Sequence, residues 1–310
     1  MGSLADITPA VYAQPVQEAH GIPLPWWAKM AAKVVLARLL PSYRARKALG
    51  IFRHGRMDYD FLGHSLWTSK VFEWHRQFGS GAARTVLELG PGDSVGTALF
   101  ATAHGADRIW LIDVGDFATR DMAIYREIVD SLKASAPDLA TRVDLSDRDR
   151  MLASLNAAYI TSATGSLAAV TEGSVDVVTS AAVLEHVRRA EFTTALAEMF
   201  RVLRPGGTAC HLIDLRDHLS GGLHNLRFPE RFWEHSFLAR SGFYTNRLRS
   251  YEILAMMEAA GFEAAIAHVT RWPELPMPRE AMTRQFSELP DDELRIADFA
   301  VLLRKPVEGH

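Results

Sequence analysis

Two glycines and one acidic residue in the first third of the chain have the types and the spacing of a nucleoside-binding site. Gly90 and Gly92 follow an apolar run, 85–89, and Asp113 ends a second apolar run, 109–112. We expect two strands here, with a glycine turn and a helix between them. Glycine lets the backbone approach a ligand, and the helix N-terminus offers unpaired N–H groups. An acid at the tip of the second strand can accept both ribose hydroxyls, so the pattern predicts a nucleoside cofactor.

The composition of the loop distinguishes between two kinds of nucleoside cofactor. A dinucleotide fingerprint reads G-x-G-x-x-G, whereas Gly96 comes one place late and Pro91 and Asp93 lie inside the loop. The Asp93 carboxylate would repel a pyrophosphate but tolerates a cationic sulfonium that carries an amino-acid tail. Glu88, just before the loop, favours the same cofactor. A nicotinamide-dependent dehydrogenase remains the alternative.

Four segments resemble the class I S-adenosylmethionine-dependent methyltransferases, with a methyltransferase type 11-like domain, in the order of that family. The first is the E-L-G-P-G loop together with Asp113. The others are SVDVVTSAAVLEHV at 174–187, MFRVLRPGGTACHLID at 199–214, and a closing pair, GFEAAIAHVT at 261–270 and RIADFAVLLRKP at 295–306. The resemblance implies an α/β, Rossmann-like, seven-stranded, mostly parallel sheet with a C-terminal antiparallel hairpin.

The same resemblance implies which residues contact the donor, S-adenosyl-L-methionine. The glycine loop would accept its backbone contacts and Asp113 its ribose. A loop after the third strand, expected over 158–161, would contact its adenine, with Asp144 as a competitor for that role. The residues implied for cofactor binding are Glu88, Gly90, Gly92, Ser94, Asp113, Val114, Gly165, Ser166, Leu167 and Ser180.

Histidines and acids gather where the fourth and fifth strands are expected to end, beside the acceptor. Ligands of open α/β sheets lie beyond the carboxyl ends of the strands. His218, His211 or His186 could take a proton from an acceptor hydroxyl as a catalytic base.

The segment HLIDLRDH, residues 211–218, has two further interpretations. Asp214, Asp217 and His218 could hold Mg²⁺ or Mn²⁺, which would lower the acceptor's pKa. Alternatively, these groups cap and pair at a strand-to-loop exit, with Arg216 as a counter-charge.

The segment after Gly222 is aromatic and basic, and it could form the wall of the acceptor pocket. The substrate-binding candidates are Asp214, His224, Arg227 and Trp233. Equally, its aromatic residues could be the core of a cap. A pocket of this kind favours a small-molecule or glycan acceptor.

The elements that must position these residues fall into two parts. Residues 1–81 are expected to form an N-terminal tail, over 1–21, and a helical cap with helices at 25–40 and within 57–78. Residues 82–310 are expected to form the methyltransferase domain, with a substrate-loop insertion at about 215–250. The basic residues of 25–56 favour a cap edge in solvent over the alternative, contact with an anionic membrane surface.

Composition narrows the function classes. The net charge of −3 argues against a nucleic-acid partner. A single cysteine, Cys210, excludes an internal disulfide. The absence of a secretory signal or of a long apolar run predicts a cytoplasmic protein, and the oligomeric state stays open.

The function predicted from these observations is S-adenosylmethionine-dependent O-methylation of a small molecule or glycan, with a histidine that deprotonates the acceptor. The alternatives are an N- or C-methyltransferase, the dehydrogenase, and a non-catalytic cofactor-binding subunit.

Overall fold

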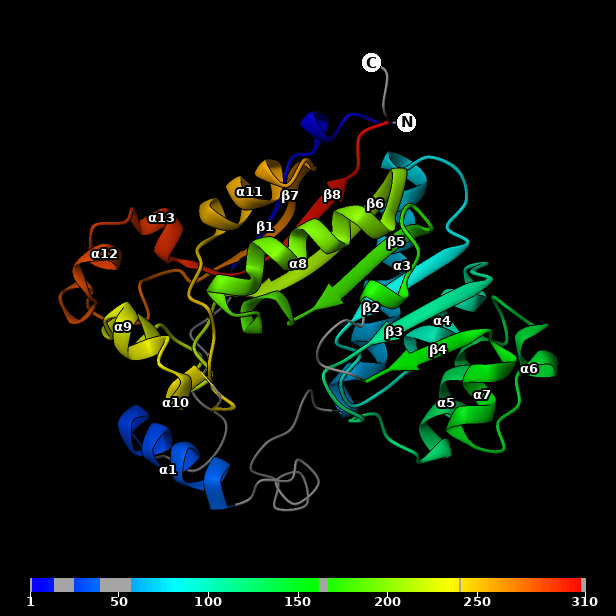
Figure 1. Ribbon diagram of the computed structural model, residues 1–310, viewed down its shortest axis with the longest axis horizontal. Helices are drawn as coiled ribbons and strands as arrows, with labels where there is room; N and C mark the ends of the chain where they lie inside the picture. The colour runs from blue at the N-terminus through cyan, green and yellow to red at the C-terminus, as the bar shows by residue number, and fades with distance from the viewer. Residues whose placement is uncertain (1, 14–24, 40–56, 162–166, 240, 308–310) are drawn as a thin grey trace.

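The computed structural model describes residues 2–13, 25–39, 57–161, 167–239 and 241–307. An eight-stranded sheet with the order β1-β7-β8-β6-β5-β2-β3-β4 runs through its centre (Figure 1). The strands are β1 Ala10–Ala13, β2 Thr85–Leu89, β3 Arg108–Ile112, β4 Ala157–Ile160, β5 Val175–Ala181, β6 Leu203–Asp214, β7 Glu263–Arg271 and β8 Ile296–Arg304.

The pairing of the strands confirms a mostly parallel sheet with a C-terminal antiparallel pair. Strand β8 lies antiparallel to both β6 and β7, and every other pairing is parallel. The predicted number of seven strands is wrong, because β1 adds an eighth at the edge of the sheet, with Ala10 opposite His268. All four residues of β1 are exposed. A strand that buries neither face leaves no alternating apolar pattern in the sequence, so residues 1–21 read as a tail.

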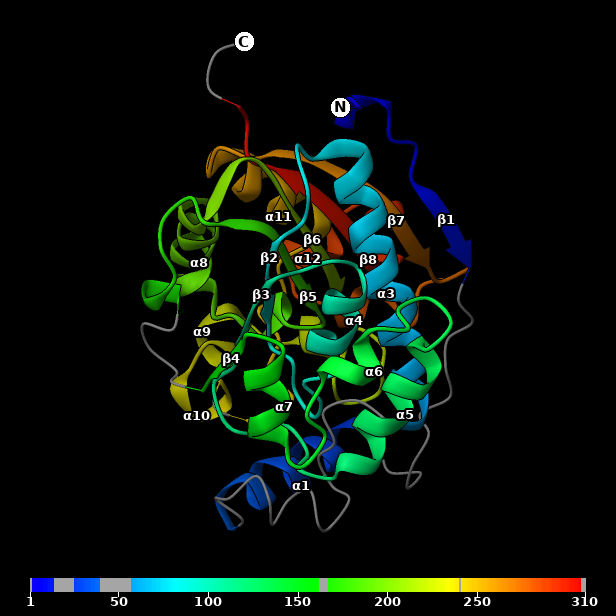
Figure 2. The ribbon, with the colours of Figure 1, turned by 90° about the vertical axis from the view of Figure 1, so that its right-hand side faces the viewer.

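Helices cover both faces of the sheet. The helices around it are α3 Met57–Phe78, α4 Thr97–Ala103, α5 Met122–Leu132, α6 Leu139–Arg142, α7 Arg148–Ser154, α8 Arg189–Val202 and α11 Ser250–Ala259. Side chains of α3, α4, α5 and α7 form one core with Val86 and Ile109, whereas α8 and α11 form a second core with Leu87 and Val178. Successive strand residues point to opposite faces, so strands β2 to β8 each contribute to both cores. Figure 2 shows α3 and α8 on opposite sides of the sheet.

Two loop excursions pack against each other at the edge where the parallel strands end. The first, 215–249, contains the 3-10 helix His224–Arg227, α9 Glu230–Trp233 and α10 Ser236–Ala239. The second, 272–295, contains the 3-10 helix Arg279–Ala281, α12 Arg284–Ser287 and α13 Asp291–Leu294. Their apolar residues share one cluster, in which Leu226 meets Trp272 and Phe286. The predicted insertion is thus accompanied by a second one between β7 and β8.

Helix α1, Trp26–Leu39, lies beyond the carboxyl ends of the strands and beside α9 and α10 (Figures 1 and 2). Its residues Trp26, Met30 and Val34 pack on a cluster that contains Trp233 and Tyr244. The opposite side of the helix is exposed, including Trp27. The helix therefore covers this end of the sheet, as a cap would. None of the described helices is long and apolar enough to cross a membrane.

Two residues of helix α11 test which face of this helix packs into the second core. Met257 is fully buried, whereas Tyr251 on the same helix is half exposed. We expect Met257→Ala to lower the free energy of unfolding by about 2–5 kcal/mol, because it leaves a cavity. Tyr251→Ala should change it by less than about 0.5 kcal/mol. Urea unfolding followed by circular dichroism measures both values, and equal losses would contradict the packing described here.

Candidate active site

The predicted donor and acceptor residues meet at one edge of the sheet. Strands β6, β5, β2 and β3 are neighbours and run parallel, so their carboxyl ends lie side by side. The glycine loop follows β2, Asp113 follows β3, and His186 follows β5. The carboxyl ends of parallel strands are where open α/β sheets bind ligands.

The glycine loop lies in close contact with the turn after β5. Gly90 and Gly92 have φ angles of +66° and +63°, a region that residues with a Cβ enter at a cost. A Cβ on Gly90 would lie 2.5 Å from Cγ2 of Val183. The backbone of Gly90 also donates to the Ile112 carbonyl at 2.7 Å, which ties the loop to β3. Glycine therefore follows this path between two strands at a lower cost than a residue with a Cβ.

Asp113 anchors the same loop through its carboxylate. One oxygen accepts a hydrogen bond from the Gly92 N–H at 2.9 Å, and the other accepts from the Val114 N–H at 2.7 Å. The side chain of Val114 is 69% exposed, although it is apolar and lies in the middle of the site. Asp113 and Val114 therefore border a surface on which a polar sugar and a flat apolar base would both find partners.

Three further residues implied for donor binding are buried, and their hydrogen bonds support the strands and turns around the glycine loop. Glu88 accepts a hydrogen bond from the Thr97 hydroxyl at 3.0 Å, which joins β2 to α4. Ser94 accepts from the Gly96 N–H at 3.1 Å. Ser180 lies under the site, where it bonds to His211. Leu167, another residue implied for donor binding, begins the 3-10 helix Leu167–Ala169. Gly165 and Ser166 lie outside the described residues.

The loop after β3 is held by two residues that the sequence did not point to. Buried Arg148 pairs with Asp116 at 2.5 Å and donates to the Ala118 carbonyl at 3.0 Å. The Tyr159 hydroxyl donates to the Gly115 carbonyl at 3.0 Å. The β-strand Ala157–Ile160, predicted over 158–161, thus supports this loop. Asp144 lies away from it, since its N–H donates to Ser154 just before the start of that strand.

His186 and His218 come together from the turn after β5 and the loop after β6. Their ring centroids are 4.8 Å apart, edge to face. Nδ1 of His186 lies 2.9 Å from the Tyr244 carbonyl oxygen, which can only accept, so Nδ1 carries the proton. Burial and the nearby His186 lower the pKa of His218 to about 4, so its imidazole is neutral at pH 7. Nε2 of His218 lies 4.0 Å from an Asp214 carboxylate oxygen.

His211 occupies a different place from the other two histidines. It is fully buried in β6, and its Nδ1 lies 2.8 Å from the Ser180 hydroxyl of β5. Burial lowers its pKa to about 3. A ring with no exposed surface cannot contact an acceptor, so this geometry favours a role in joining β5 to β6.

The structure does not assemble Asp214, Asp217 and His218 as three ligands of one metal. Both oxygens of Asp217 are occupied by the turn that follows it, where they accept from the N–H groups of Ser220 at 2.6 Å and His224 at 2.7 Å. Asp214 binds the Arg216 guanidinium at 2.8 and 3.0 Å. Among the described residues, the group whose ligand atoms all lie within 4.8 Å of one another is Glu185, His186 and His218.

The sequence interpretation places Glu185 beside His186 among the candidates at the tip of the fourth strand, but assigns it no role. Its side chain is fully buried, and neither carboxylate oxygen has a hydrogen-bond partner in the described part of the chain. Burial and the charge of Asp214 raise its pKa well above the usual range. Asn246 holds its backbone, since the Asn246 N–H donates to the Glu185 carbonyl at 2.7 Å. A charged residue between an apolar run and a histidine was the only signal in the sequence.

The aromatic and basic residues predicted to line the acceptor pocket lie in two places. One is in a hydrophobic core, and two lie beside the cap helix α1. Trp233 is fully buried, and its indole N–H donates to the Thr245 carbonyl at 2.7 Å, which fits the alternative that the aromatics form a core. His224 stacks on Trp26 of α1 at 5.2 Å, and the Arg227 guanidinium lies 5.2 Å from the same ring. The cap helix and the insertion thus form one wall together.

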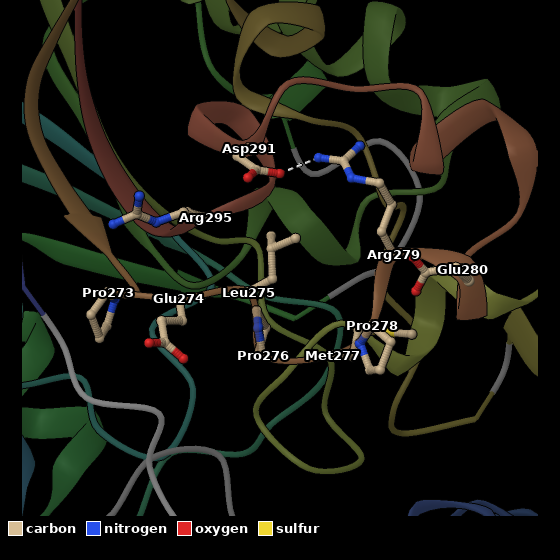
Figure 3. Close-up of a pocket in the computed structure, with 10 residues that line it drawn as sticks. All are labelled: Pro273, Glu274, Leu275, Pro276, Met277, Pro278, Arg279, Glu280, Asp291 and Arg295. Atoms are coloured by element: carbon tan, nitrogen blue, oxygen red, sulfur yellow. Dashed lines mark hydrogen bonds and ion pairs between the residues drawn. The ribbon is translucent and has the colours of Figure 1, made fainter.

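A hollow of about 740 Å³ lies elsewhere, within the second excursion (Figure 3). Its lining is Pro273, Glu274, Leu275, Pro276, Met277, Pro278, Arg279, Glu280, Asp291 and Arg295. Arg279 pairs with Asp291 across it, and Arg295 donates to the Trp272 carbonyl. None of the predicted site residues lines this hollow, and its arginines are engaged in holding the loop.

Comparison with known proteins supports the methyltransferase interpretation. Residues 127–211, from α5 to β6, match the family model described as a methyltransferase domain. This match confirms the resemblance to S-adenosylmethionine-dependent methyltransferases. No curated protein matches the chain.

Solved structures with a similar fold include methyltransferases of three kinds. The 1,6-didemethyltoxoflavin-N1-methyltransferase of Burkholderia thailandensis is 14% identical, with 93% of this chain and 94% of that chain covered and a TM-score of 0.44. An O-methyltransferase family protein from the same organism is 13% identical, with coverage of 92% and 69% and a TM-score of 0.44. The CurJ carbon methyltransferase is 13% identical, with coverage of 90% and 67% and a TM-score of 0.42.

Substituting Gly90 tests the close contact between the glycine loop and Val183. Gly173 also has a positive φ angle, +61°, but nothing lies within 4 Å of its would-be Cβ. We expect Gly173→Ala to cost about 1–2 kcal/mol of unfolding free energy from backbone strain alone. Gly90→Ala should cost about 1–3 kcal/mol more, because the Cβ overlaps Val183. Chemical denaturation compares the two variants, and a cost no greater for Gly90→Ala would contradict the contact.

Proposed function

We propose that the chain transfers a methyl group from S-adenosylmethionine to an oxygen atom of a small molecule or a glycan. The observation that carries this proposal is the contact between Gly90 and Val183. Val183 begins the turn that presents His186, and His186 packs on His218. A donor held by the glycine loop and an acceptor beside the two histidines would therefore be neighbours, as an in-line transfer requires.

Gly90, Gly92, Asp113 and Val114 fit the donor. The positive φ angles of Gly90 and Gly92 give the loop a tight backbone path, which the absence of side chains permits. The Asp113 carboxylate is positioned by two backbone N–H groups, and it can accept hydrogen bonds from ribose hydroxyls. Exposed Val114 offers an apolar surface to adenine. When bound, the donor supplies an electrophilic methyl group, and its sulfonium becomes a neutral thioether as the new bond to the acceptor forms.

His218 is our choice for the group that accepts the proton of the acceptor hydroxyl. Its imidazole is neutral at pH 7 because burial lowers its pKa, so it has a lone pair to accept with. Asp214, 4.0 Å away, would stabilise the imidazolium that forms. His186 is the second candidate, since its proton on Nδ1 leaves Nε2 as the accepting nitrogen. We assign His224 and Arg227 to the wall of the acceptor pocket. We assign His211 a structural role in the interior of the sheet.

We assign to the cap helix α1 the exclusion of water from this end of the sheet. Lys33 of α1 donates to the His218 carbonyl at 2.5 Å, so the helix contacts the loop that carries the base. The aromatic cluster under α1 keeps that contact in place. Water exclusion strengthens electrostatic interactions in the site and prevents wasteful hydrolysis.

Asp113→Ala tests the donor half of the proposal. We expect the affinity for S-adenosylhomocysteine, measured by calorimetry, to fall roughly 10- to 100-fold, since charged hydrogen bonds contribute about 1.5–3 kcal/mol each. Asp144→Ala is the matched control, because Asp144 is a half-buried acid that closes a local turn with Ser146. Unchanged affinity in Asp113→Ala would remove Asp113 from the donor site. Tight NADH binding with none for S-adenosylhomocysteine would establish a dehydrogenase instead.

Transfer of labelled methyl groups tests the acceptor half. The enzyme is incubated with methyl-labelled S-adenosylmethionine and a cell extract separated into small-molecule, glycan, lipid, protein and nucleic-acid fractions. We expect label in the small-molecule or glycan fraction. His218→Asn should lower turnover by about 10²- to 10⁴-fold, the usual contribution of a general base, whereas the exposed control His235→Asn should not.

The other outcomes identify the alternatives. Full activity of His218→Asn would contradict the assigned base and favour methylation at nitrogen or carbon. Label in the nucleic-acid fraction would contradict the acceptor class. Affinity for S-adenosylhomocysteine without turnover in any fraction would favour a non-catalytic cofactor-binding subunit.

A further inference from the structure

Three potential metal ligands converge at the acceptor end of the sheet. Glu185 and His186 are consecutive residues of the turn after β5, and His218 lies on the loop after β6. One carboxylate oxygen and one nitrogen from each imidazole all lie within 4.8 Å of one another. Metal–nitrogen and metal–oxygen distances of about 2.0–2.2 Å place neighbouring ligands roughly 3 Å apart. Side-chain rotations would therefore bring the three atoms around one ion without moving the backbone.

The second observation is independent of the distances among the three ligand atoms. It concerns the burial and the hydrogen bonding of the Glu185 carboxyl group. A carboxyl group that is fully buried and has no hydrogen-bond partner for either oxygen is costly in a protein interior. Two other buried titratable residues, His75 and His211, each make a side-chain hydrogen bond, to Thr208 and Ser180. Glu185 has no such side-chain partner among the described residues, and one of its carboxylate oxygens lies within 4.8 Å of a nitrogen of each imidazole. A cation between them would satisfy it.

The backbone around His186 orients its ring for coordination. Since the Tyr244 carbonyl accepts the Nδ1 proton at 2.9 Å, Nε2 is the nitrogen with the lone pair. Histidines that ligate metals usually donate their other N–H in this way. Asn246, two residues further on, holds the turn by donating its side-chain amide to the carbonyls of Leu184 and Val187 at 2.9 and 3.0 Å. The insertion after β6 therefore supplies an outer shell for the ligands of the turn.

We infer that Glu185, His186 and His218 bind a divalent metal ion. Two imidazoles and one carboxylate suit Mn²⁺, Fe²⁺, Co²⁺ or Zn²⁺, whereas Mg²⁺ and Ca²⁺ prefer sites made of oxygen ligands. This set replaces the one expected from the sequence, because the Asp217 carboxylate is occupied by its own turn. Asp214 lies beside the group as a further negative charge and is paired with Arg216.

The site has a use that rests on the proposed function. Three protein ligands leave coordination positions open, and an acceptor hydroxyl bound there would have its pKa lowered by the ion. In that arrangement the ion takes the place of the histidine base, because the lone pairs of His186 and His218 would bind the metal, and the hydroxyl proton would pass to bulk water.

Direct metal binding tests the inference without any need for an acceptor. The chelator-treated full chain is titrated with Mn²⁺, and free Mn²⁺ is followed by its electron paramagnetic resonance signal; Zn²⁺ is titrated by calorimetry. We expect one site per chain. Glu185→Gln keeps the size of the side chain but not the charge, and it should weaken binding at least 10-fold, as should His218→Asn. His268→Asn is the control, because His268 also lies near an acid, 3.7 Å from Asp298, but outside the group.

Several results would overturn the inference. They are no saturable binding of either ion by the wild type, unchanged affinity in Glu185→Gln, or an equal loss in His268→Asn. Urea midpoints of each variant show whether it folds, and His218→Asn gives a second test if Glu185→Gln does not. S-adenosylhomocysteine binding, measured on the same samples, separates this inference from the proposed function. Donor binding and turnover that persist in chelator, with no metal bound, would contradict the metal alone.

Discussion

The close contact between Gly90 and Val183 is the constraint on which the rest of the site depends. It leaves no room for a Cβ, and it joins the loop after β2 to the turn after β5. Asp113 fixes the same loop from the other side by accepting from the Gly92 N–H. Because both contacts involve backbone atoms, the loop is rigid with respect to two neighbouring strands. Such a scaffold can hold donor and acceptor groups in register with little reorganisation.

The acceptor side is built from segments that are distant in the sequence. Asn246 of the insertion binds the backbone of the turn after β5, and Lys33 of α1 binds the backbone of the loop after β6. Trp26 brings the cap helix onto His224. The polar residues of this region therefore differ in role. Asp217 and Trp233 organise the loop, whereas one potential ligand atom from each of Glu185, His186 and His218 lies within 4.8 Å of the other two.

Much of the fold was predictable because it leaves a local signal. The strands β2, β3, β5, β7 and β8 are apolar runs bounded by glycine, proline or charged residues, and all lie where the sequence placed them. The glycine loop is equally local, since its chemistry depends on Gly90 and Gly92 themselves. Strand β1 escaped prediction because it buries no side chain. The excursion 272–295 escaped because its short helices are stabilised by packing on Leu226 of another loop rather than by their own periodicity.

The sequence by itself determined the central strands of the sheet, the glycine loop and the acid that faces it, because consecutive residues encode each of these features. Only the tertiary structure decided which histidines lie together. His211 and His218 are seven positions apart and look alike in the sequence, but one faces the interior of the sheet and the other meets His186. The proximity of His218 to Glu185 was equally invisible in the sequence, since the two residues come from different loops. Burial and contact between distant segments decide such roles, and neither is a property of the local sequence.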